Sequence, residues 1–540
     1  MNNNLEKLNN EQKKAVTHKD GPLLIVAGAG TGKTTVITRR IAYIIERGWA
    51  KSDEILALTF TEKAAGEMEE RVDRLLPMGY LDLWISTFHS FGERILKEHG
   101  LEIGLPADFK LLNEFEQWSL IRKNLDKFDL DYYRPMGNPA KFIHALIKHF
   151  SRAKDEDISP ADYLKYAEGL RENLDGMLSG AITKTRKHGN TKTLKYKNTK
   201  TQKHETCAVP RYGNTKTNID GENNKEIAEQ EVMRINEVAN AYHVYQQLLL
   251  DNSALDFGDL INYSLKLFRE RPAILEKYRR QFKFILLDEF QDTNWAQYEL
   301  IKMLAQPRNN LVVVCDDDQA IFRFRGASMS NVLQFKKDYL KAEKVVLVKN
   351  YRNKQNILDL SYKFIKLNNP NRLEYQFAKD AKEGMKLNKK LIAQGKGEGV
   401  IEVIQGSDLQ DEVGRVVEKI ADIKIQSKNS SWNDFAILVR ANDSAKDFCG
   451  ALEIAGLPYQ FLSSRGLYAK PVIMDLTAYL KLLDDYHESA AVYRILNLPV
   501  LNFSYQELVN FNYIARKKAW SLYTVLRDSR GRLGSEIQQK

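Results

Sequence analysis

Hydrophobic positions along the chain follow two alternating patterns. Short apolar runs of the length of buried strands are separated by longer stretches in which apolar residues recur at helical spacing. Strands that alternate with helices predict the α/β class, in which helices cover a parallel sheet. The predicted strands lie near Leu23, Ile55, Trp84, Phe284, Val312 and Val345.

The first apolar run, residues 23–26, leads into a glycine-rich loop and then a helical stretch that ends near Glu46. Strand, loop and helix in this order are typical of a P-loop, in which backbone N–H groups surround phosphate oxygens and a lysine adds positive charge. The sequence therefore predicts an ATP site in which Thr34 also binds Mg²⁺. Its residues are Ala27, Gly28, Ala29, Gly30, Thr31, Gly32, Lys33 and Thr34, with Ala27 where glycine is usual.

A second apolar run, residues 284–287, ends in two adjacent acids. Asp288 is the predicted second Mg²⁺ ligand, and Glu289 is placed to orient or deprotonate an attacking water. An acidic pair alone is more often a solvated strand end, but the preceding P-loop favours the catalytic interpretation. Glu289 and Lys33 are therefore predicted to be catalytic.

Composition narrows the class of protein further. None of the apolar runs in the 540 residues reaches the roughly 18 residues needed to cross a bilayer. The N-terminus has no apolar segment of the signal-peptide type, and the three cysteines form neither a metal-ligand cluster nor a disulfide framework. A cytoplasmic protein without membrane contact is expected.

The net charge of +10 is concentrated in one segment. Residues 181–225 hold eleven Lys/Arg and three Asp/Glu, and within them lie five octads, four of which share Thr-Lys-Thr in register. Residues 182–221 lack any apolar period, which predicts a disordered insertion. Two hypotheses remain for it: an electrostatic arm for phosphates, or a tandem expansion tolerated in a surface loop.

Six short segments, taken in order, resemble motifs of the UvrD/Rep/PcrA family of superfamily 1 DNA helicases. They are residues 8–12 (LNNEQ, the Q motif), 59–65 (TFTEKAA, Ia), 86–90 (STFHS, Ib), 287–293 (LDEFQDT, II), 315–327 (CDDDQAIFRFRGA, III) and 350–353 (NYRN, IV). The departures from the family pattern are Glu62 at a frequent Asn, Phe290 at a common Tyr, Cys315 at a usual Gly and Phe324 at a usual Trp.

The resemblance implies roles for residues beyond the P-loop. Gln12 would contact adenine, Tyr351 would offer its ring to the base, and Arg352 would contact the γ-phosphate as a catalytic residue. Gln319, also catalytic, would couple the γ-phosphate to the DNA-facing residues. Single-stranded DNA would be bound by Phe60, Thr87, His89, Phe322 and Phe324, whose aromatic rings can stack on bases.

The resemblance also predicts a domain organisation. A RecA-like motor domain, 1A, would comprise residues 1–90 and 280–342, interrupted by a helical domain, 1B, at 91–279. Residues 343–464, with FAILVR at 435–440 and LPY at 457–459, resemble the first part of a second motor domain, 2A. Residues 465–540 would form part of an inserted helical domain, 2B.

The function implied is ATP-dependent 3′–5′ translocation on single-stranded DNA, with unwinding at duplex junctions. No stretch after Leu498 resembles motifs V and VI, so an alternative is a truncated or split helicase that binds ATP and DNA but hydrolyses ATP poorly. A nuclease-linked helicase is a further alternative. A small-molecule P-loop kinase would leave motifs II and III unexplained. The resemblance leaves the pathway open, whether repair, replication restart or plasmid replication.

Overall fold

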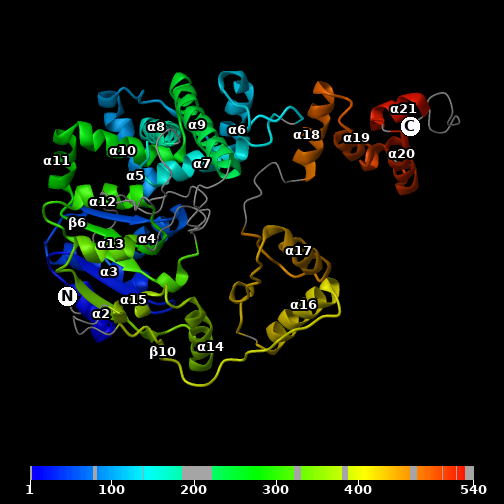
Figure 1. Cartoon of the computed structure of the whole chain (residues 1–540). Coiled ribbons are helices and arrows are strands. Elements are labelled where there is room, and N and C mark those ends of the chain that lie inside the picture. The colour runs from blue at the N-terminus through cyan, green and yellow to red at the C-terminus, as the bar shows by residue number, and fades with distance from the viewer. Residues whose placement is uncertain are drawn as a thin grey trace. The chain divides into compact units, whose positions relative to one another are not determined.

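Figure 1 shows the computed structural model of the chain. It describes residues 3–76, 82–137, 139–184, 222–321, 330–379, 387–427, 429–462, 471–501, 503–518 and 520–529. The chain divides into two compact units, Met1–Val400 and Ile401–Lys540.

The first unit is built on a six-stranded parallel sheet with strand order β3-β2-β6-β7-β1-β8. All six strands predicted from the sequence are present, which confirms the α/β class. Their bounds are β1 (Leu23–Ala27), β2 (Ile55–Thr59), β3 (Trp84–Thr87), β6 (Phe284–Leu287), β7 (Leu311–Cys315) and β8 (Glu343–Leu347).

Alternate residues of each strand enter two separate cores, as the two-residue period of a strand requires. In β1, Leu24 and Val26 join the core on one face of the sheet, whereas Leu23 and Ile25 join the core on the other. The first core is closed by α5 (Phe88–His99), α10 (Phe257–Glu270), α11 (Pro272–Gln281), α12 (Trp295–Ala305), α13 (Ser330–Asp338) and α15 (Leu373–Lys379). The second is closed by α2 (Asn10–Thr17), α3 (Lys33–Glu46) and α4 (Glu62–Asp73).

A helical region with its own core interrupts this sheet between β3 and β6. It contains the long neighbouring helices α8 and α9. It also contains a two-stranded parallel pairing of β4 with β5. The helix α10 and most of α5 and α11 lie in the segment 91–279 that was predicted as 1B, and these three helices pack on the central sheet. The elements are β4 (Lys110–Leu111), α6 (Glu114–Lys123), α7 (Ile143–Asp155), α8 (Pro160–Lys184), α9 (Glu222–Asp251) and β5 (Ala254–Leu255).

The octad segment falls mostly outside the described residues. Residues 182–184, which were predicted to begin the disordered insertion, form the last turn of α8. The helix that begins at Pro160 thus continues three residues into the first octad. Residues 185–221 are not described, so the two hypotheses for the octads stay predictions.

The predicted start of the second motor domain, residue 343, coincides with the first residue of β8. This strand pairs along its whole length with β1 in the first sheet, because its apolar residues fill the open edge beside β1. The sheet of the first motor domain therefore extends to Leu347. Next come β9 (Lys349–Asn350), α14 (Gln355–Ile365), α15 and β10 (Ile392–Ala393), with β10 parallel to β9.

The second unit consists mainly of helices. Among its described residues it contains no strand, and the apolar run at 435–439 forms neither a helix nor a strand, with the Leu438 side chain 94% exposed. No helix in the described parts of the chain combines the length and apolar character needed to cross a membrane. The helices are α16 (Leu409–Gln426), α17 (Ala445–Ile454), α18 (Pro471–Asp484), α19 (Ser489–Leu496), α20 (Tyr505–Lys518) and α21 (Leu522–Ser529); the short α1 (Asn3–Glu6) opens the chain.

Candidate nucleotide site and DNA-facing surface

The glycine-rich loop joins the end of β1 to the start of α3 and is packed tightly on two sides. Gly30 and Gly32 have φ angles of 72° and 88°, a left-handed conformation that favours glycine. A Cβ on Gly32 would lie 2.8 Å from Gln12 Nε2, and one on Gly30 would lie 2.7 Å from Asn350 Nδ2. These two glycines therefore let side chains from distant segments approach the loop.

Gln12 is held against the loop by the start of its own helix. Asn9 and Gln12 form a reciprocal capping box at α2, and Gln12 Nε2 donates to the carbonyl of Thr31 at 2.9 Å. Asn9 Nδ2 in turn donates to the hydroxyl of Tyr351 at 2.9 Å. An open pocket of about 370 Å³ lies here, lined by Lys7, Leu8, Gln12, Gly30, Gly32, Thr35, Arg39, Tyr351 and Arg352.

Residues 350–353 are fastened to the loop by a buried asparagine. Asn350 Nδ2 donates to the carbonyl of Ala29 at 2.6 Å, while its Oδ1 accepts from the backbone N–H of Arg352 at 2.9 Å and of Asn353 at 2.7 Å. The predicted Tyr351 and Arg352 are exposed beside the pocket. Asn350 was not predicted as a site residue, because a motif does not reveal which member carries the anchoring contacts.

The two acids after β6 differ in environment. Asp288 is buried, and burial together with the neighbouring Glu289 raises the pKa of its carboxyl to about 6. Glu289 has φ 50°, a left-handed conformation that is uncommon for a residue with a side chain. Its Oε2 accepts from Lys33 Nζ at 2.7 Å, so the structure brings the predicted base and the P-loop lysine into contact.

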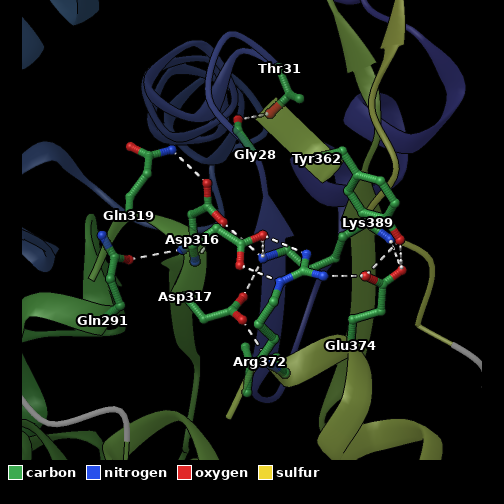
Figure 2. A network of polar contacts seen from close by, with 12 residues as sticks. Gly28, Thr31, Gln291, Asp316, Asp317, Gln319, Tyr362, Arg372, Glu374 and Lys389 are labelled. Atoms are coloured by element: carbon green, nitrogen blue, oxygen red, sulfur yellow. Dashed lines mark hydrogen bonds and ion pairs between the residues drawn. The ribbon is translucent and has the colours of Figure 1, made fainter. Parts of the chain in front are cut away.

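Five residues form a closed ring of hydrogen bonds, in which Asp316 takes part through both its backbone N–H and its carboxylate. Lys33 Nζ and Gln291 Nε2 both donate to Glu289 Oε2 at 2.7 Å. Gln291 Oε1 accepts from the backbone N–H of Asp316 at 2.9 Å, and Gln319 Nε2 donates to Asp316 Oδ2 at 2.6 Å (Figure 2). Gln319 Oε1 completes the ring 3.4 Å from Lys33 Nζ.

The chemistry of the partners fixes both amide orientations in this ring. A carboxylate only accepts and an ammonium only donates, so the Gln319 amide must turn its nitrogen to Asp316 and its oxygen to Lys33. The same reasoning fixes Gln291 between a backbone N–H and Glu289. The sequence predicted Gln319 from its motif but not Gln291 or Asp316, whose roles depend on the spacing of two strand ends.

Mg²⁺ fits the donor set at the predicted position. Thr34 lies in the first turn of α3, and Asp288 is a buried carboxyl beside a second acid. Such a carboxyl is stabilised as an anion by a nearby hard cation, and Mg²⁺ prefers carboxylate and hydroxyl oxygens in addition to phosphate. Thr34 and Asp288 would hold the ion.

The DNA-facing candidates lie where β2 and β3 end. Thr87 caps α5, accepting from the backbone N–H of Ser90 at 3.1 Å, and its hydroxyl donates to Glu62 Oε1 at 2.8 Å. His89 contacts the Phe257 ring edge-on at 5.7 Å, and burial lowers the pKa of its imidazole despite the nearby acids. Phe60 follows β2 and is half-buried. Phe322 and Phe324 lie outside the described residues.

A parallel sheet with a glycine-rich loop after β1 and an acidic pair after β6 defines a P-loop nucleoside triphosphatase. The UvrD/REP helicase N-terminal domain matches residues 8–340, and the UvrD-like helicase C-terminal domain matches residues 345–534. The chain belongs to the UvrD/REP helicase family.

Curated relatives agree with this assignment. The chain is 34% identical over 496 residues to the ATP-dependent DNA helicase PcrA of Bacillus subtilis (strain 168), covering 92% of this chain and 56% of that protein. It is 32% identical over 514 residues to the protein of the same name from Leuconostoc citreum, covering 94% of this chain and 57% of the relative. The chain thus spans a little over half the length of these relatives.

Proposed function

We propose that the chain is an ATP-driven motor that moves along single-stranded DNA in the 3′–5′ direction and unwinds duplex junctions. The observation that carries this proposal is the closed ring of Lys33, Glu289, Gln291, Asp316 and Gln319. It joins a phosphate-binding lysine, a general base and a residue of the DNA-facing motif III in one network. The direction rests on the family resemblance alone.

The nucleotide binds with its base in the open pocket and its phosphates on the loop. Gln12 contacts adenine, and the exposed ring of Tyr351 stacks on it. Backbone N–H groups of residues 27–34 and the Lys33 ammonium surround the β- and γ-phosphates. Arg352, on the pocket wall, supplies a charge-assisted contact to the γ-phosphate.

Hydrolysis follows from the position of Glu289. The oxygen of a water attacks the γ-phosphorus as the bond to the ADP oxygen breaks, and the Glu289 carboxylate accepts the proton of that water. Lys33 turns from Glu289 to the phosphates, so nucleotide binding itself releases the base. Mg²⁺ at Thr34 and Asp288 would neutralise charge on the phosphate oxygens and leave the chain to orient the water.

DNA is bound at the ends of β2 and β3, together with motif III. Phe60 and His89 offer ring faces, Thr87 lies at the N-terminus of α5, where a phosphate is favoured, and Phe322 and Phe324 add further aromatic faces. Gln319 precedes these last two residues in sequence and contacts the Lys33 side chain. A change at the γ-phosphate is thereby passed to the DNA-facing motif.

The test measures ATP turnover with and without single-stranded DNA, and unwinding of duplexes that carry a 3′ or a 5′ tail. We expect DNA to stimulate turnover, Lys33→Ala to abolish it, and only the 3′-tailed duplex to be unwound. Equal turnover in Lys33→Ala would exclude this site as the motor. Tight binding of ATP and DNA with turnover near background would favour the alternative, a binding module.

A further inference from the structure

Three consecutive aspartates after β7 face two cations from a later part of the chain. The carboxylate oxygens of Asp316, Asp317 and Asp318 lie within 4.8 Å of one another, a spacing at which like charges repel strongly. The Lys389 ammonium lies among them, 2.9 Å from Asp316 Oδ1 and 2.8 Å from Asp318 Oδ2, and it also contacts Asp317.

Arg372 is the second cation that contacts this cluster. Its Nε and Nη2 donate to the two oxygens of Asp318 at 2.7 and 2.8 Å, a bidentate pair, and its Nη1 donates to Glu374 at 3.0 Å (Figure 2). Lys389 and Arg372 are both buried. Burial opposes the charge of Lys389, but the three carboxylates outweigh it and hold the pKa of its ammonium above the ordinary value. Lys389 is therefore a fixed cation and not a proton carrier.

The two oxygens of Asp316 are divided between this cluster and the nucleotide site. Oδ1 accepts from Lys389, and Oδ2 accepts from Gln319 at 2.6 Å. Rotation of the Asp316 carboxylate would break both contacts together. The lysine thus holds the carboxylate in the rotamer that turns the Gln319 amide oxygen toward Lys33.

The segment that carries Lys389 also lies along the P-loop. Two residues further on, the Leu391 side chain approaches Gly28 so closely that a Cβ there would lie 2.8 Å from Leu391 Cδ2. Immediately after, β10 pairs with β9, whose Asn350 is bonded to Ala29. Residues 387–393 therefore contact the nucleotide site at both motif III and the loop.

We propose that Lys389 is a positioning residue for ATP hydrolysis, which orients Gln319 through Asp316 and links residues 387–393 to the reacting end of the nucleotide. The proposal rests on the proposed function of the site. It predicts that Lys389 affects the transition state for phosphoryl transfer and not the binding of the nucleotide in its ground state. No contact in the described residues joins Lys389 directly to the open pocket.

The experiment compares the affinities of the full chain for Mg²⁺–ADP and for Mg²⁺–ADP–aluminium fluoride, a mimic of the transferring phosphoryl group. For Lys389→Met we expect unchanged ADP affinity and about tenfold weaker binding of the mimic. Lys389→Arg, which keeps the charge, should recover most of this loss. Lys390→Met, at an adjacent exposed lysine that pairs with Asp359, is the matched control and should behave as the wild type.

A double variant separates positioning from general damage. In Lys389→Met, adding Gln319→Ala should weaken binding of the mimic little further, because both changes disrupt the same chain of contacts from Lys389 through Asp316 to Gln319. If the two losses multiply, or if ADP binding falls in parallel with that of the mimic, Lys389 is not a positioning residue. Lys389→Met/Asp317→Asn restores the net charge of the cluster and serves if the single variant does not fold. A wild-type chain that binds neither ligand would instead refute the proposed function.

Discussion

The hydroxyl of Thr87 donates a hydrogen bond to Glu62 Oε1 at 2.8 Å, and the hydroxyl of Ser90 donates to the same oxygen at 2.6 Å. These two bonds, that from Ser90 foremost, hold the pKa of the Glu62 carboxyl below its ordinary value. A residue of α4 therefore places a permanent negative charge at the strand ends proposed to bind DNA.

Replacing this charge is expected to strengthen DNA binding. Glu62→Gln keeps the acceptor for Thr87 but removes repulsion of the DNA phosphates, so affinity for single-stranded DNA should rise about fivefold at low salt. The gain should shrink as salt is added. Anisotropy titrations at several salt concentrations measure it. Glu69→Gln, on the same helix, is the control, and equal affinities of wild type and Glu62→Gln would count against this DNA-binding surface.

Glu289→Gln should separate binding from turnover. The amide keeps the size of the side chain but cannot take the proton of the attacking water, so kcat should fall about a hundredfold or more while ATP affinity is retained. Steady-state turnover and a fluorescent-nucleotide titration give the two quantities. Glu299→Gln, on α12, should change neither, and a Glu289 variant with normal kcat would assign the base elsewhere.

Tyr351 should matter for the base of the nucleotide and not for its phosphates. Tyr351→Ala is expected to weaken ATP binding about tenfold and to leave binding of inorganic tripolyphosphate unchanged, because only the stacking face is lost. Tyr351→Phe keeps the ring and loses only the bond from Asn9, so an effect of about twofold is expected. Parallel losses for ATP and tripolyphosphate would show that the loop itself is disturbed.

A buried lysine in the helical region should be important for stability. Lys154 Nζ lies 2.7 Å from Asp256 Oδ2 and 2.8 Å from Asp259 Oδ1, and all three residues are buried. Lys154→Met leaves two uncompensated acids, so the free energy of unfolding should fall by about 3 to 5 kcal/mol. Urea denaturation measures the change. Lys148→Met, at an exposed position of the same helix, should cost less than about 0.5 kcal/mol.

The stability of the chain should depend on pH through Asp155. Burial, opposed by a hydrogen bond from Asn294, raises the pKa of its carboxyl to about 7. The folded state then holds the proton more tightly than the unfolded state, whose pKa is about 4, so stability falls as pH rises from about 4 to about 7 and changes no further above that. Stability is lost because the ionised carboxylate of Asp155 is disfavoured at its buried position.

Asp155→Asn should remove that dependence. The variant should gain about 1 to 2 kcal/mol over the wild type when pH is raised from 5 to 8, a value discounted for the partial exposure of the side chain. Denaturation of both proteins at pH 5 and pH 8 measures the gain. An advantage of equal size at both pH values would mean that Asp155 does not titrate in this range.

Local patterns were sufficient to predict the central sheet and the loop. β1, β2 and β7 are buried along their full length, so their apolar runs are short and continuous, and the residues of the P-loop follow β1 directly. Gln12 and Asn350 contact this loop from positions already contained in recognised motifs. Such segments carry their signal within a few consecutive residues.

The cations around motif III could not be predicted in the same way. Lys389 and Arg372 lie in segments without a motif, and each meets its aspartates across more than fifty positions of sequence. In sequence they resemble ordinary surface residues, because the burial of a charged side chain can be recognised only when the positions of its partners are known. Lys154 was missed for the same reason. The strand near Val345 was predicted, but its pairing with β1 was not, because the residues of an edge strand do not specify which strand it pairs with.

The left-handed backbone conformation of Glu289 implies a conflict between the stability of the protein and its turnover. A residue with a Cβ pays about 1 kcal/mol to adopt φ 50°, whereas glycine adopts it freely. Glu289→Gly would relieve this strain and remove the proposed base at the same time. Stabilising substitutions chosen by backbone geometry alone would therefore select Glu289 together with Asp157, Ser253 and Asn309, and at Glu289 the gain in stability would come with loss of the proposed base.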